Sequence, residues 1–350
     1  MKQLLLSACL IAGSAATLHA DDRDFNYMPK GGYASPTGAE YVVASSERKL
    51  KPGQKTANLT KLNFAGEAIV QRLTDRAYWA QAGFYSTIFY VGDEGVLIMD
   101  PLAFGSGEKI LKAIGTVTDK PVTAIIYSHY HGDHIGDVGV YVKAAEGRGH
   151  DLRIIASDAT EKMLKQVKTK LPLPTETIKF KGGSTKFENL TVRVHGLENP
   201  SHDKDSGVWE LVGEKVVHFP DLVNPDQMPF MGFAGAESYK KYILNLETLN
   251  GMDWDYLSGG HGDVGSHKDV TFVQNYIVDL EQAILTARKE AGKQRFFEKI
   301  YNNHQAQGYA GNEFINKKAA EILREKYGNY YGFEAGVGAQ IHMSRDTAHH

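Results

Sequence analysis

The chain has 350 residues, 42% of them hydrophobic and 23% charged, with a formal net charge of −3 and a single cysteine. These values are typical of globular proteins and exclude extensive disorder, a collagen-like fibre and a disulfide-stapled miniprotein. The 39 basic side chains are balanced by 42 acidic ones without a long run of one sign, which disfavours a nucleic-acid partner. The length allows one large domain or two smaller ones.

The first 20 residues have the features of an export signal. Lys2 gives a basic start, Leu4–Ala16 is apolar and small, and a Leu-His-Ala triplet ends at Ala20, directly before two aspartates. The apolar run is shorter than the ~20 residues that span a bilayer, and no later segment has such a run. We therefore expect a periplasmic or secreted protein without stable membrane insertion.

Cys9 also matches the cleavage pattern of bacterial lipoproteins, but it stands ahead of most of the apolar run, which disfavours lipid attachment there. Removal of residues 1–20 leaves a mature chain without cysteine. Such a protein depends for its stability on its core, with or without a metal ion, since disulfides are excluded.

Residues 21–60 are rich in glycine, proline, serine and lysine and show no sustained hydrophobic period. This composition predicts an extended arm that wraps the domain.

Beyond the arm, two β-rich halves are each followed by helical patterns. The expected strands are Ala68–Leu73, Tyr85–Val91, Gly95–Asp100, Val122–Tyr127, Leu152–Ala156, Thr177–Lys181, Leu190–His195, Val208–Val212 and Lys215–Phe219. The expected helices are Gly107–Gly115, Asp158–Leu171 with Asp158 as its cap, Ser238–Leu249, Val270–Ala291 and Glu313–Tyr327. This order predicts an α+β fold of two packed sheets with helices outside.

The most informative segment follows the apolar strand Val122–Tyr127. It carries His129, His131, Asp133 and His134 in a glycine-containing loop. Alternate residues at a strand end can point the same way, so the first two histidines can reach one metal, while the turn directs the other two side chains toward a second. Imidazole and carboxylate ligands suit zinc, and iron or manganese could also bind. A chance cluster on a surface loop is disfavoured because three of only 14 histidines fall within six positions.

This His-x-His-x-Asp-His pattern resembles the signature of the metallo-β-lactamase superfamily. The resemblance covers roughly Ala68–Asp263 and implies an αββα sandwich of two packed mixed sheets with helices on both outer faces. It also implies three further ligands: a third histidine at the first metal, a carboxylate that bridges both metals, and a final histidine at the second.

The third histidine is assigned to His202, although serine and aspartate flank it where the family usually has glycine and then threonine or serine. His195 is the competitor, but it ends an alternating strand, where a packed or exposed histidine is the more ordinary interpretation. The bridging carboxylate is assigned to Asp221, which follows an apolar strand, and the last ligand to His261, in a glycine-rich loop. His218, within the strand before Asp221, is expected to pack or to face solvent.

The resemblance thus implies two metal ions, expected to be zinc. One would be held by His129, His131 and His202 and the other by Asp133, His134 and His261, with Asp221 between them. Asp133 is also expected to accept or hand on a proton, and Asp100 to support the ligands from outside. Aromatic candidates for a substrate pocket are Trp79, Phe84, Tyr85 and Phe230.

We therefore expect a hydrolase of a small molecule with an ester, lactone, thioester or amide-like bond, a β-lactam included. Two alternatives stay open: a mononuclear iron enzyme of the sulfur dioxygenase type, and a non-catalytic periplasmic binding protein on the same scaffold. A nuclease is disfavoured by the charge balance and the export signal. The expected division of the chain is a signal at 1–20, the arm at 21–60, a catalytic domain at 61–291 and a helical C-terminal extension with a tail at 292–350. Nothing in the sequence indicates the oligomeric state.

Overall fold

A computed structural model describes residue 29 and residues 32–56, 66–294 and 302–347 of the chain. The predicted export signal, Cys9 and the first part of the arm lie outside the described residues. Within the described ranges, no helix combines the length and apolarity that crossing a bilayer requires.

The first sheet has seven strands in chain order. They are β1 (Ile69–Arg72), β2 (Ala77–Ala82), β3 (Tyr85–Val91), β4 (Val96–Met99), β5 (Val122–Tyr127), β6 (Arg153–Ser157) and β7 (Glu176–Ile178). Strands β1 to β4 form an antiparallel meander, whereas β4 to β7 are parallel. The parallel strands β4, β5 and β6 are almost entirely buried, as their continuous apolar runs require.

The second sheet has six strands in the order β13-β12-β11-β10-β9-β8. They are β8 (Lys181–Phe187), β9 (Leu190–Gly196), β10 (Gly207–Val212), β11 (Val216–His218), β12 (Tyr256–Ser258) and β13 (Val264–Gly265). All neighbours are antiparallel except β11 and β12, which are parallel. The sheet is therefore mixed, like the first one.

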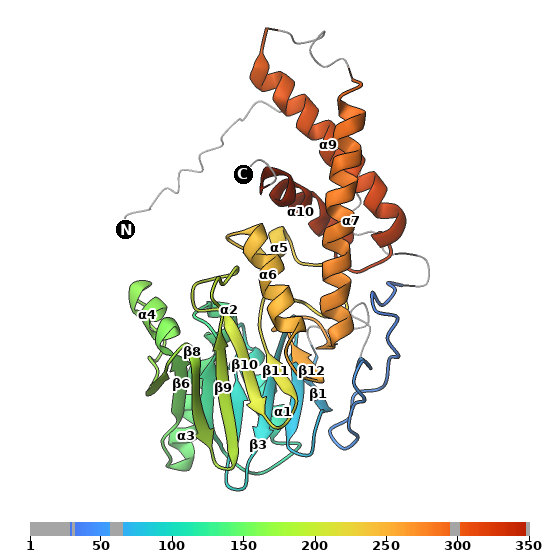
Figure 1. Ribbon diagram of the computed structural model, residues 1–350. Coiled ribbons are helices and arrows are strands. Elements are labelled where there is room, and N and C mark those ends of the chain that lie inside the picture. Colours follow the sequence, from blue (N-terminus) through green and yellow to red (C-terminus); the bar gives the residue numbers. More distant parts are fainter. Residues whose placement is uncertain (1–28, 30–31, 57–65, 295–301, 348–350) are drawn as a thin grey trace, which may run out of the picture.

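Helices cover the outer face of each sheet (Figure 1). On the first sheet lie α1 (Ser106–Ile114), α2 (Gly132–Ile135), α3 (Val138–Arg148) and α4 (Asp158–Gln166). On the second lie α5 (Gly232–Gly235), α6 (Tyr239–Asn250) and the first part of α7 (His267–Ala291). Beyond the sheet, α9 (His304–Tyr327) and α10 (Phe333–Thr347) pack against α7 and against each other (Figure 1). Between the sheets, Trp79 and Trp209 are fully buried among aliphatic side chains of both. The predicted αββα sandwich is confirmed.

The strands and helices differ from the sequence-based expectation in a few places. Strands β2 and β8 and helices α3 and α10 were not expected, and α4 is shorter than predicted. Ser157 rather than Asp158 caps α4, because its hydroxyl accepts a hydrogen bond from the Thr160 amide, whereas Asp158 accepts one from the amide of Phe180 (2.9 Å).

The described part of the arm runs along the edge of the sandwich (blue in Figure 1). The Leu50 amide donates to the carbonyl of Arg72 at the outer strand of the first sheet (2.9 Å), and the Leu50 side chain is buried in the core between the sheets. The hydroxyl of Tyr256, on the second sheet, donates to the Leu50 carbonyl. The arm therefore joins the edges of both sheets.

Candidate metal centre

The metal-ligand candidates gather at one end of the sandwich because of the strand directions. His129 follows β5, and Asp221 and His261 follow the parallel pair β11 and β12. His202 lies in the connection between β9 and β10. Loops at the carboxyl ends of neighbouring parallel strands meet at the same edge of a sheet, so residues up to 132 positions apart in the sequence come together.

The first group consists of His129, His131, His202 and Asp221, with one potential ligand atom from each lying within 4.8 Å of the others. His202 Nε2 is 3.0 Å from His131 Nδ1 and 3.2 Å from Asp221 Oδ2. His129 Nε2 is 3.4 Å from the same carboxylate oxygen. His195 does not take part, since its Nε2 pairs with Glu210 Oε2 at 2.7 Å.

The second group consists of Asp133, His134 and His261, again within 4.8 Å. His134 Nε2 is 3.5 Å and His261 Nε2 is 3.7 Å from Asp133 Oδ2. Asp221 also faces this group, because its Oδ2 is 3.1 Å from His134 Nε2 and its Oδ1 is 3.2 Å from His261 Nε2. One carboxylate therefore lies between the two groups, as the resemblance implied.

Burial and charge shift the pKa values of the side chains in the centre. Burial lowers the pKa of His129 to about 4, so its imidazole is neutral at pH 7 and free to bind a cation. Burial would also lower the pKa of His134, but the carboxylate of Asp221 and those of Asp100 and Asp133 raise it to about 9. Burial likewise would raise the pKa of Asp221, but the surrounding histidines, His134 first, hold it well below its ordinary value. The centre is thus an anionic pocket that favours positive charge.

The residues fit a metal ion by an independent criterion. Nε2 of His129 and both ring nitrogens of His134 are buried without a hydrogen-bond partner. These nitrogens lie 3.1 to 3.6 Å from carboxylate oxygens of Asp221 and Asp100 without the geometry of a hydrogen bond. Buried polar groups without a hydrogen bond call for an explanation such as an ion. A donor set of imidazole nitrogens and carboxylate oxygens suits zinc, iron or manganese.

Asp100 lies behind the candidate ligands, at the end of β4. Its carboxylate accepts hydrogen bonds from the amide (2.7 Å) and hydroxyl (2.6 Å) of Ser128, and the same hydroxyl lies 2.9 Å from His129 Nδ1. His218 Nε2 is 2.8 Å from Asp100 Oδ2, and both residues are fully buried. His218 packs within its strand, as expected, but its contact with Asp100 was not anticipated, since no sequence spacing links residues on different sheets.

Three further contacts are made by candidate ligand histidines through the ring nitrogen that faces away from the centre. The carbonyl of Phe84 lies 3.0 Å from His261 Nδ1, and that of Ala234 lies 2.6 Å from His202 Nδ1. Asp203 Oδ2 is 3.3 Å from His131 Nε2. Such partners fix the tautomer and orientation of a metal-binding histidine. Asp203 was noted in the sequence only as a departure from the family's usual pattern.

The loops of the centre hold unusual backbone conformations. Asp100 and Asp221 have φ values of 45° and 66°, a region that non-glycine residues rarely adopt. Gly260, beside His261, has φ 76°, and a Cβ there would lie 2.6 Å from Cε1 of His134. Glycine is therefore required at this position both by conformation and by space.

The aromatic pocket candidates differ in their placement. Phe84 and Phe230 are about half exposed, and the Tyr85 ring lies 5.1 Å from that of His261. Trp79 instead is fully buried in the core between the sheets and does not line a pocket, because it belongs to strand β2, all of whose residues are buried. Phe104, which the sequence analysis missed, is 80% exposed, has φ 56° and lies 5.9 Å from the Tyr85 ring.

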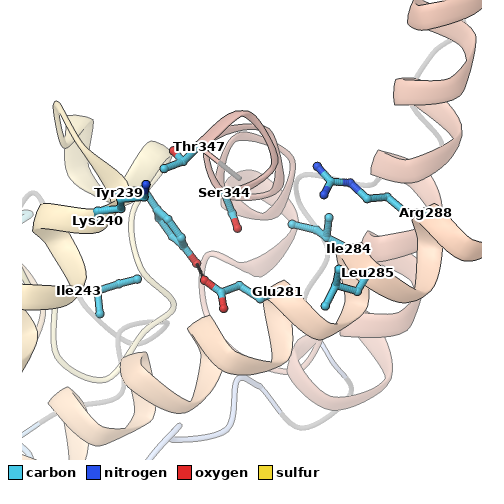
Figure 2. Close-up of a pocket in the computed structure, with 9 residues that line it drawn as sticks. All are labelled: Tyr239, Lys240, Ile243, Glu281, Ile284, Leu285, Arg288, Ser344 and Thr347. Atoms are coloured by element: carbon cyan, nitrogen blue, oxygen red, sulfur yellow. Dashed lines mark hydrogen bonds between the residues drawn. The ribbon is translucent and has the colours of Figure 1, made fainter. Parts of the chain in front are cut away.

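A separate cavity of about 270 Å³ lies between α6, α7 and α10 (Figure 2). Its lining residues include Ile243, Ile284 and Leu285, and the Tyr239 hydroxyl donates to Glu281 Oε1 across it (3.1 Å). None of the metal-ligand candidates contributes to it.

Comparisons with known proteins identify the family and the fold of the chain. A family model described as the metallo-beta-lactamase superfamily matches residues 81–261. A solved structure, a metallo-beta-lactamase from Pontibacter korlensis, is similar over 60% of this chain and 98% of that chain, with a TM-score of 0.50 and 17% identity. At this identity the likeness shows the fold alone.

Two curated relatives are enzymes. Subunit alpha of 2,4-dinitroanisole O-demethylase from Nocardioides sp. (strain JS1661) is 26% identical over 194 residues, which are 53% of this chain and 55% of that protein. Linear primary-alkylsulfatase from Pseudomonas sp. (strain ATCC 19151) is 33% identical over 66 residues, 19% of this chain and 12% of that protein. The chain spans about half the length of the first relative and less of the second. The family model, which covers more than half of the chain and ends at His261, shows that this chain belongs to the metallo-beta-lactamase superfamily.

Proposed function

We propose that the protein is a binuclear metal-dependent hydrolase of a small molecule. The observation that carries this proposal is the position of Asp221 between the two ligand groups, with its oxygens 3.1 to 3.4 Å from histidines of both. We expect His129, His131 and His202 to hold one ion and Asp133, His134 and His261 the other, with Asp221 shared. When bound, divalent ions acidify a water molecule and polarise the bond that is cleaved, and zinc is the ion we expect.

Asp133 is the residue we propose for proton transfer. Its side chain is one-third exposed, whereas Asp221 is almost completely buried. A carboxylate that touches both the ligand shell and solvent can accept a proton from the attacking water and release it to the leaving group. Asp221, enclosed by histidines, is suited to binding and not to exchange with solvent.

The walls of the centre favour a substrate with an apolar part. Phe104 is exposed and lies against the Tyr85 ring, which in turn lies against His261. Phe84 is also exposed, and its carbonyl contacts His261. Phe230 is exposed in the segment whose Ala234 carbonyl contacts His202. Exposed aromatic side chains that flank a polar centre are typical of a binding site. We therefore propose an alkyl or aryl compound with an ester, lactone, thioester or amide-like bond, a β-lactam included.

A second candidate is cleavage of an ether or a sulfate ester. It is favoured by the two enzymes named above, an O-demethylase subunit and an alkylsulfatase. The same centre and the same apolar walls would serve such substrates, because attack by an activated water does not require a carbonyl group. A small panel of substrates separates the two candidates.

We further propose that the protein acts in the periplasm or outside the cell, on the basis of the export features of residues 1–20. Fractionation of the producing cells, followed by N-terminal sequencing of the mature protein, tests this. An N-terminus at Asp21 in the periplasmic or secreted fraction is expected, and an uncleaved cytoplasmic protein would contradict it.

The test of function is a panel of chromogenic substrates offered to the zinc-loaded protein: a nitrophenyl ester, a lactone, a thioester, a β-lactam, an aryl methyl ether and an alkyl sulfate. We expect turnover of at least one, and loss of at least a hundredfold in kcat for Asp133→Ala. His195→Ala is the matched control, because this histidine pairs with Glu210 outside the centre, and we expect unchanged activity. Binding without turnover that Asp133→Ala leaves unaltered would contradict the proposal and favour a binding protein, and oxygen consumption with one iron per chain would favour a dioxygenase.

A further inference from the structure

The arm places a lysine in the interior of the protein. Lys55 is completely buried, and its ammonium group donates to both oxygens of Asp269 (2.9 and 3.0 Å) and to the carbonyl of Val264 (2.9 Å). Asp269 lies in the first turn of α7, where it forms a capping box with Ser266. A buried ammonium is tolerated only where carboxylates and carbonyls replace its hydration.

Two more buried aspartates receive hydrogen bonds from the same arm. Asp226 accepts from the Ser35 hydroxyl (2.7 Å) and the Tyr41 hydroxyl (2.6 Å). Asp263 accepts from the amide and the hydroxyl of Thr56 (both 3.0 Å). The amide of Asp226 in turn donates to Asp269 (3.0 Å). Burial would lower the pKa of Lys55, but the negative charges of Asp269, Asp226 and Asp263 all act on it and raise its pKa, and we call these four residues the arm network.

These aspartates lie in the loops that carry metal-ligand candidates. Asp226 is five residues after Asp221, and Asp263 is two residues after His261. The two loops also pack backbone against backbone. The amide of Asp221 donates to the carbonyl of Gly259 (3.1 Å), and that of Asp263 to the carbonyl of Pro225 (3.3 Å).

The two loops pack so closely that there is no space for a side chain at Gly259 or Gly262. A Cβ on Gly259 would lie 2.0 Å from the Val223 carbonyl oxygen, and one on Gly262 would lie 2.4 Å from that of Pro225. Asp221 and Asp226 both have left-handed backbone conformations, with φ of 66° and 65°. Such conformations persist only where the surrounding contacts enforce them.

We propose that the arm, through Ser35, Tyr41, Lys55 and Thr56, is a positioning element for the metal centre. It holds the loops of Asp221 and His261 in the geometry that lets both side chains reach one ion. The arm residues touch no ligand atom; they act through Asp226, Asp263 and Asp269. This inference rests on the proposed metal centre and adds to it a segment that lies outside the part of the chain matched by the family model.

The test uses graded variants, because Lys55→Met leaves three buried carboxylates without their cation and is liable not to fold. The double variant Tyr41→Phe/Thr56→Val removes one hydrogen bond to Asp226 and one to Asp263 and leaves Lys55 in place. The matched control is Tyr327→Phe, which removes a tyrosine-to-carboxylate hydrogen bond of the same length (2.6 Å, to Asp279) between α9 and α7. Metal affinity is measured by titrating the metal-free full chain with Zn²⁺ against a competing chelator, and thermal unfolding is recorded for each variant.

We expect the arm variant to bind the less tightly held of the two Zn²⁺ ions with about tenfold lower affinity. This is the lower end of the range found when residues that contact metal ligands from outside are removed. Tyr327→Phe should lower the unfolding temperature without changing either affinity. If the arm variant also loses stability but keeps both affinities, the arm has only a structural role and the inference fails. If the unaltered protein binds no Zn²⁺, it is the proposed metal centre that fails.

Discussion

At the residue scale, the proposed metal binding depends on which of the two ring nitrogens of each histidine has no partner outside the centre. Carbonyl or carboxylate partners lie against the outer nitrogens of His131, His202 and His261. The inner nitrogens thereby remain as lone-pair donors that face Asp221 and each other. Spacing along the chain pointed to the histidines themselves, but not to partners such as Asp203 and His218, because those contacts exist only after both sheets have packed.

Asp203 allows a direct test of this arrangement. Asp203→Asn keeps the shape of the side chain but removes the negative charge beside His131 Nε2 (3.3 Å). We expect metal affinity to fall about tenfold, since a charged partner makes the imidazole a better ligand. Zn²⁺ titration in the presence of a chelator measures the change. Asp93→Asn, at the β3–β4 turn away from the centre, is the control, and an equal affinity for all three proteins would contradict the assigned role.

Asp205, fully buried near Asp203, makes stability depend on pH. Burial raises its pKa to about 7, well above the value in an unfolded chain. The folded state therefore binds more protons than the unfolded state between about pH 4 and pH 7, and stability falls as the pH rises through that window. We expect Asp205→Asn to be more stable than the natural protein at pH 8, by up to about 4 kcal/mol, and much less so at pH 4.5. Denaturant unfolding at both pH values measures this, and a gain of equal size at both would show that the charge of Asp205 is not the cause.

At the element scale, the sequence predicted the strands with a clear apolar or alternating residue pattern and missed those without one. Strands β5, β9 and β10 have clear apolar or alternating patterns and are found within one residue of their predicted ends. Strand β8 contains two glycines and two lysines, and it forms because β9 offers hydrogen bonds along its length. The sequence of strand β2 has no alternating pattern and did not predict a strand, but the rest of the fold buries all of its residues.

The loop after β12 is the element on which the second ligand group most depends. Gly260→Ala would place a methyl group 2.6 Å from Cε1 of His134 at φ 76°. We expect loss of the weaker metal ion and a destabilisation of about 1–3 kcal/mol from the strained conformation. Gly213→Ala, at φ 88° with open space around it, separates strain from contact and should keep both metals. Metal analysis and thermal unfolding of both variants check this; equal metal content would contradict it.

At the scale of the whole molecule, the αββα sandwich follows from two mixed sheets that bury one face against each other and the other beneath helices. The order of β-rich and helical segments was sufficient to predict this architecture. The role of the arm was not predictable, because its composition indicates only an irregular segment, whereas Lys55 and Leu50 are buried in the structure.

Metal removal should affect the whole fold. The candidate ligands come from loops of both sheets, so a bound ion would tie these loops together. Anything that binds the folded state alone stabilises it, by about 4 kcal/mol at a concentration 1,000 times the dissociation constant. We expect a chelator to lower the unfolding temperature by several degrees and added Zn²⁺ to restore it. An unfolding temperature that does not respond to the chelator would argue against bound metal.

The central claim, two ions that share Asp221, is tested most directly by the metal content of the purified chain, measured together with its hydrolytic activity before and after Asp221→Ala. We predict about two zinc ions per chain and turnover of at least one substrate in the panel, with Asp221→Ala reducing the content to one ion or fewer and abolishing turnover. A single iron ion per chain with oxygen consumption, or two zinc ions retained without Asp221, would contradict the account.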